Sequence, residues 1–66
     1  MNDIKKGYEL LKEVVKEKND IFSYLVLTDA LQYFKKAGSV AGLGAVIMYS
    51  PYLEQKVMEF VKEIRL

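Results

Sequence analysis

The chain has 66 residues, with ten basic residues against nine acidic ones and neither cysteine nor histidine. A chain of this size predicts one domain, which buries only about 60% of the surface that the unfolded chain exposes. The missing residue types exclude disulfides and the usual zinc ligands, and a net charge of +1 does not predict a polyanionic partner. Tight helix packing or self-association must therefore reinforce the small core.

The composition also predicts whether the chain folds and in which compartment it lies. With 52% hydrophobic residues, the chain is expected to fold rather than to remain a disordered tail. No apolar signal segment follows the polar start Met1-Asn2-Asp3. Because the absence of cysteine fits a reducing compartment, we expect a cytoplasmic protein.

The first predicted element is an amphipathic helix over residues 4–18. Asn2 or Asp3 can cap its start, whereas Gly7 weakens the first turn enough for regular helix to begin there instead. Lysine and glutamate residues fill one face of this helix. The other face carries apolar residues at helical spacing, broadened by two neighbours: Ile4, Tyr8, Leu11 and Val15, with Leu10 and Val14.

Residues 21–37 form the second element, and Asn19-Asp20 ends the first helix and can cap this one. The polar residues within it recur at spacings of one, three and four, which favours a helix ended by Gly38 in the left-handed conformation. These polar residues are Thr28, Asp29, Gln32, Lys35 and Lys36. The alternative makes Ile21–Leu27 a strand followed by a shorter helix. We favour the helix, since a two-stranded parallel sheet would be unusual in so short a chain.

The third element covers residues 39–49 and carries no charge. Small residues recur every fourth position, at Ala37, Ala41 and Ala45 and again at Gly38 and Gly42. On a helix they form a smooth stripe that lets another backbone approach closely. We interpret this segment as a buried central helix.

The last element is an amphipathic helix over residues 51–65. Ser50 can cap it, and Pro51 suits the first helical position, whose N–H has no partner within a helix. Charged residues occupy one side of the helix. The apolar stripe consists of Leu53, Val57, Phe60, Val61 and Ile64.

The sequence offers little for catalysis. Without histidine or cysteine, acid–base chemistry at neutral pH needs a carboxylate, lysine or tyrosine with a strongly shifted pKa. Asp29 is the carboxylate closest to apolar residues, and we interpret it as part of the exposed polar stripe. The glycines at 38, 42 and 44 have the spacing of a dinucleotide-binding loop, but that loop belongs to a sheet larger than this chain allows. We therefore predict a non-enzymatic protein without a metal or cofactor.

Two alternative functions depend on the uncharged segment and on the lysine residues. Residues 37–53 are uncharged, which raises the alternative of a small membrane-active or immunity-type protein. A spanning helix needs ~20 predominantly apolar residues, more than this interrupted segment provides. The second alternative is a dimeric nucleic-acid-binding regulator that pools Lys35 and Lys36, although residues 40–49 offer only Tyr49 to a base or phosphate.

The sequence thus predicts an all-α bundle of three or four short helices that forms a homo-oligomer, most simply a homodimer. It would act by contact with a further, unidentified protein, as a regulator, adaptor or inhibitor. Two amphipathic helices cannot cover both the second and third elements, so we expect a second copy to pack on the small-residue stripe. Tyr49 and Tyr52 bracket Pro51 at a corner, and tyrosine is enriched in interfaces. The candidate interaction surface comprises Phe22, Val40, Ala41, Gly42, Leu43, Ala45, Ile47, Met48, Tyr49 and Tyr52.

Overall fold

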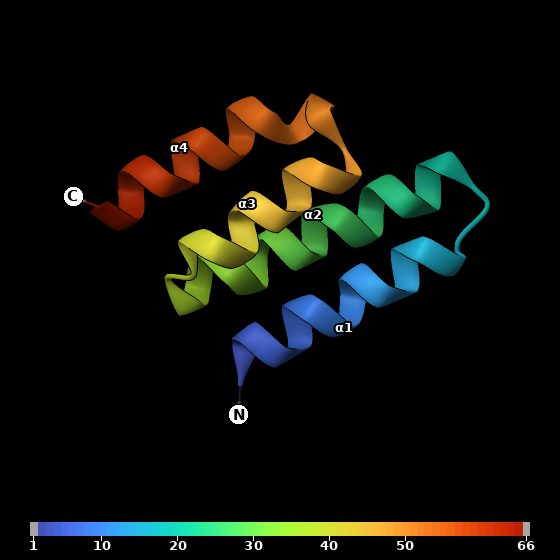
Figure 1. The fold of residues 1–66 in the computed structure, drawn as a ribbon, viewed down its shortest axis with the longest axis horizontal. Helices are drawn as coiled ribbons and strands as arrows, with labels where there is room; N and C mark the ends of the chain where they lie inside the picture. The colour runs from blue at the N-terminus through green and yellow to red at the C-terminus, as the bar shows by residue number, and fades with distance from the viewer. Residues whose placement is uncertain (1, 66) are drawn as a thin grey trace.

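The computed structural model describes residues 2–65 as α-helices joined by short connections, with one 3-10 turn (Figure 1). The elements are α1 (Asp3–Lys16), α2 (Asp20–Ala37), α3 (Val40–Tyr49), η1 (Pro51–Leu53) and α4 (Glu54–Arg65). No strand occurs among residues 2–65, so the all-α prediction is confirmed and the strand alternative for residues 21–27 is wrong.

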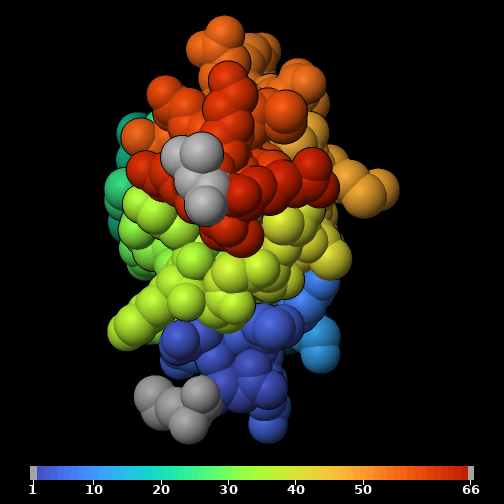
Figure 2. All heavy atoms as spheres, turned by 90° about the vertical axis from the view of Figure 1, so that its left-hand side faces the viewer, coloured from blue at the N-terminus to red at the C-terminus, as the bar shows by residue number. Residues whose placement is uncertain are grey.

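Successive helices run in opposite directions, which places the connections at alternate ends of the bundle (Figure 1). The α1–α2 turn and the α3–η1 connection lie at one end. The α2–α3 turn, the start of α1 and the end of α4 lie at the other, which faces the viewer in Figure 2. α1 packs mainly along α2 and also touches α3, whereas α4 packs mainly on α3.

Polar side chains begin three of the helices. Asn19 begins α2, where its side-chain oxygen accepts hydrogen bonds from the backbone N–H groups of Ile21 and Phe22 at 2.9 and 3.1 Å. Asn2, rather than Asp3, caps α1, and the Ser39 hydroxyl caps α3. Each cap satisfies backbone donors that have no partner within the helix.

Three helix ends follow the sequence signals to different degrees. Gly38 ends α2 with φ 70°, a left-handed conformation that glycine adopts without steric cost. Pro51 begins the 3-10 turn η1, but the Ser50 side chain makes no capping hydrogen bond, contrary to expectation. α1 ends at Lys16 instead of 18 because Glu17 is extended, with its carboxylate accepting the next two backbone N–H groups.

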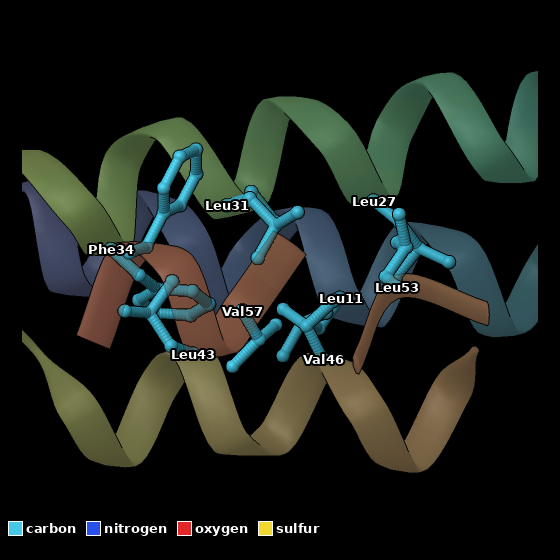
Figure 3. Close-up of a cluster of buried hydrophobic side chains, with 10 residues drawn as sticks. Leu11, Leu27, Leu31, Phe34, Leu43, Val46, Leu53 and Val57 are labelled. Atoms are coloured by element: carbon cyan, nitrogen blue, oxygen red, sulfur yellow. The ribbon is translucent and has the colours of Figure 1, made fainter. Parts of the chain in front are cut away.

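One apolar core joins all the helices (Figure 3). Its buried side chains come from every element: Leu11, Leu27, Ala30, Leu31, Phe34, Leu43, Val46, Leu53, Val57 and Phe60. The predicted stripe of the last helix is confirmed, since Val61 and Ile64 also pack against this core. Phe34 is fully buried, and the ring of Tyr8 meets it edge-on with a centroid separation of 5.0 Å.

The predicted apolar face of α1 is confirmed except near its C-terminal end, where Val15 is 70% exposed. Three of its predicted residues are buried or pack against the core: Leu10, Leu11 and Val14. Regular helix begins at Asp3, before Gly7 rather than at it. Gly7 is also buried, and a Cβ atom on it would lie 2.5 Å from a ring carbon of Phe34. The absence of a side chain at Gly7 therefore lets α2 approach α1 closely.

Candidate interaction surface

Part of the predicted interaction surface lies inside the bundle. Leu43 is completely buried, and Gly42 faces the ring of Phe34 so closely that a Cβ atom would come within 3.0 Å of it. Ala45 and Ile47 are partly buried and pack against the core. The close approach predicted for the small-residue stripe thus occurs at Gly42, but it is made by α2 of the same chain. Gly42 and Leu43 are corrected to core residues.

The remaining predicted positions are more accessible. Val40 is half-buried at the start of α3, and Ala41 is exposed one position further on. Met48 and Tyr52 are 86% and 96% exposed. These two residues, with the exposed Phe22 and Tyr49, are the part of the prediction that stays available to a partner.

These four residues share one end of the molecule with other exposed apolar side chains. The end holds the C-terminus of α1, the N-terminus of α2 and the α3–η1 connection (Figure 1). We call it the apolar end and define it by Val15, Ile21, Phe22, Tyr24, Leu25, Met48, Tyr49 and Tyr52, all exposed. Sequence reasoning missed Val15, Ile21, Tyr24 and Leu25, because their apolar character was taken as a sign of burial.

The apolar end contains an open groove of about 490 Å³. We call it the tyrosine groove, since three tyrosines line it. Its lining residues are Val14, Asp20, Ser23, Tyr24, Leu27, Tyr49, Ser50, Pro51 and Tyr52. Asp20 is the one charged side chain among them.

Charges of both signs surround the apolar end. Lys16 and Lys18 flank the α1–α2 turn, Asp20 begins α2, and Glu54 begins α4, all exposed. None of them forms an ion pair with another residue in the range 2–65. The Glu17 carboxylate is already engaged by the backbone N–H groups of Lys18 and Asn19, both at 3.1 Å.

The basic residues at the opposite end do not form a free basic face. Lys35 Nζ lies 3.1 Å from a carboxylate oxygen of Glu63 and 4.4 Å from the ring centroid of Phe60. The other basic pair, Lys5 and Lys6, lines a shallow depression that also contains Asp3 and Glu9. Acidic neighbours thus accompany both lysine pairs.

Residues 2–65 contain no group of three or more acidic side chains placed to hold a metal ion, and Asp29 is exposed on α2. Within this range no helix combines the length and apolar character needed to cross a membrane. Comparison of the chain with protein-family models, curated proteins and solved structures finds no match.

Proposed function

We propose that this chain is a non-enzymatic interaction module that docks its apolar end on another protein, and that its first partner is a second copy of itself. The observation that supports the proposal is that the exposed apolar side chains of the apolar end belong to segments that meet at one end of the bundle (Figure 1). Exposed apolar surface concentrated in one region marks interaction surfaces, whereas single exposed apolar residues need no explanation.

The exposed area is of the right order for a protein interface. The four aromatic side chains of the apolar end are between 46% and 96% exposed. At about 150–250 Å² for a whole aromatic side chain, they leave roughly 400–600 Å² in contact with water. The four aliphatic side chains of the same end bring the total close to the ~800 Å² that each partner contributes to a standard interface.

Self-association would also stabilise the fold of a chain whose core is small. A chain of 66 residues without disulfides buries little apolar surface on folding. Covering the apolar end with a second copy removes more of that surface from water, at about 25 cal/mol per Å². A dimer that later exchanges this contact for another protein would act as a regulator, adaptor or inhibitor.

The test is the molecular mass in solution from low micromolar to millimolar concentration, measured by sedimentation equilibrium. We expect the wild-type chain to approach twice the monomer mass as concentration rises. Phe22→Asp and Met48→Asp, which place charges within the apolar end, should remain monomeric. Met58→Asp is the matched control, because Met58 is 50% exposed on α4 outside the apolar end.

Other results would argue against the proposal. A wild-type chain that stays monomeric over the whole range removes the second copy as the partner. Flotation with vesicles of zwitterionic or anionic lipid in the same samples would instead support the membrane-active alternative. If Met58→Asp and Met48→Asp lower the molecular mass equally, the interface does not lie at the apolar end.

A further inference from the structure

We propose that the two copies meet across a twofold axis at the α1–α2 turn, so that Lys18 of each copy enters the tyrosine groove of the other and pairs with its Asp20. This inference rests on the proposed self-association and goes beyond it by naming the contact that orients the copies. It makes each groove a binding site that a side chain of the second copy completes.

The charge pattern of the turn supports this contact. Lys18 and Asp20 have opposite charges, lie on either side of Asn19, and have no ion-pair partner among residues 2–65. Glu17, the other nearby carboxylate, is held by backbone N–H groups within the turn. In a twofold interface residue i meets j while j meets i, so two neighbouring opposite charges near the axis form two identical pairs.

The chemistry of the tyrosine groove also suits a lysine. Asp20 supplies its single charge, and no basic side chain of the same copy lines it. A lysine suits this lining, because its apolar stem can lie along the exposed Pro51 and Tyr52 while its ammonium group reaches the carboxylate. The aromatic rings of the groove offer further attraction for a cation.

Exposed apolar side chains lie beside these charges. Val15, Ile21 and Phe22 flank the turn and are 70%, 72% and 57% exposed. With the axis at the turn, these residues of one copy face the same residues of the other. The interface then has an apolar centre with charged pairs at its rim, the usual anatomy of a protein–protein contact.

The balance of charge favours a second copy over an anionic surface. Lys16 and Lys18 are offset by Glu17, Asp20 and Glu54 around the apolar end. A lipid surface or nucleic acid would need an excess of basic residues here. A copy of the same chain offers both signs in the matching arrangement.

The experiment uses charge reversal in the full chain. Lys18→Glu and Asp20→Lys each turn both cross-axis contacts of their own dimer into like-charge contacts, so each should raise the dimer dissociation constant about tenfold or more. In an equimolar mixture, both contacts of the mixed dimer again join opposite charges. We expect its dissociation constant to return to within about threefold of the wild-type value.

The matched control reverses two adjacent charges on α1, in the separate variants Lys12→Glu and Glu13→Lys. Both residues are exposed, and neither belongs to the turn or the groove. The controls should dimerise like the wild type, and circular dichroism should show that every variant keeps its helices.

The outcomes separate this inference from the proposed function. If the wild type dimerises and Phe22→Asp abolishes the dimer, but the two reversals change nothing or their mixture is not restored, the Lys18–Asp20 contact is wrong and the proposed function stands. If the wild type is monomeric at millimolar concentration, both are overturned. The Lys18–Asp20 contact is supported only if the mixture of the two variants dimerises about as tightly as the wild type.

Discussion

Replacing Gly42 by alanine tests the packing on which the whole bundle depends. The fully buried ring of Phe34 lies against Gly7 of α1 and Gly42 of α3. A Cβ atom at either glycine would come within 3.0 Å of the ring carbons Cδ1 and Cε1. Because the ring is fully buried, it has no open space into which it could move away from an added methyl group.

The expected magnitude is the difference between two opposing effects. Alanine in the middle of a helix is more favourable than glycine by about 0.8–1.0 kcal/mol. Forcing an extra methyl group into a packed core costs typically 1–3 kcal/mol, and this site has no free space, so the upper part of that range applies. Gly42→Ala should therefore destabilise the fold by about 2 kcal/mol, which lowers the melting temperature by roughly 10 °C in a domain of this size.

Gly44→Ala is the control within the same helix. Gly44 is exposed, and nothing lies within 4 Å of the position that its Cβ atom would take. Only the helix propensity changes there, so Gly44→Ala should stabilise the fold by about 0.8–1.0 kcal/mol. The two substitutions are identical chemically, and the contrast between them, about 3 kcal/mol, isolates the contact with Phe34.

The free energy of unfolding is measured by urea denaturation at a concentration where the chain is monomeric. Phe34→Leu shortens the side chain that Gly42 faces, so adding Gly42→Ala to this variant should cost at least 1 kcal/mol less than in the wild type, a coupling within the usual ~0.5–3 kcal/mol range. Equal stabilisation by Gly42→Ala and Gly44→Ala would refute the packing. Additive effects of the Phe34 and Gly42 substitutions would refute it as well.

Three further predictions concern local features. Phe60→Ala should lower the free energy of unfolding by about 3–5 kcal/mol, because Phe60 is buried in the core. Met58→Ala, at a half-exposed site, should change it by no more than ~0.5 kcal/mol. Equal effects of the two substitutions would place Phe60 at the surface. Asn19→Ala should cost about 1 kcal/mol through loss of the α2 cap, and thermal denaturation should show Asn19→Asp to be much milder. Glu63→Gln should change stability by less than ~1 kcal/mol, since its pair with Lys35 is solvent-exposed, and a larger loss in urea denaturation would show that the pair is buried in solution.

Much of the secondary structure could be predicted because its signals are local. The Asn19 cap, the left-handed Gly38 and the helix-starting Pro51 each depend on a few neighbouring residues, and each occurs where it was expected. The last helix was also predictable, since its apolar residues lie on one face and its charged residues on the other. One buried face then satisfies the whole pattern.

Helix α2 marks the limit of this reasoning. The polar stripe marks its exposed side from Thr28 onward, but residues 21–27 contain Ser23 as their single polar residue, so periodicity cannot tell the buried side from the exposed one in this first part. The structure buries Leu27, Leu31 and Phe34 but leaves Ile21 and Leu25 exposed. In this chain the choice follows from where α1 and α3 pack, which involves residues far apart in the sequence.

The candidate site was decided by tertiary structure for the same reason. Gly42 was predicted to let a second copy approach, and its small size is instead used by Phe34 of the same chain. The apolar end unites residues from α1, α2 and the α3–η1 connection, which no single stretch of sequence contains. The sequence by itself determined which segments are helical and where α2 begins and ends, because capping preferences act over one turn. Only the packing of the helices decided which apolar side chains are covered, because burial depends on neighbours brought close by the fold.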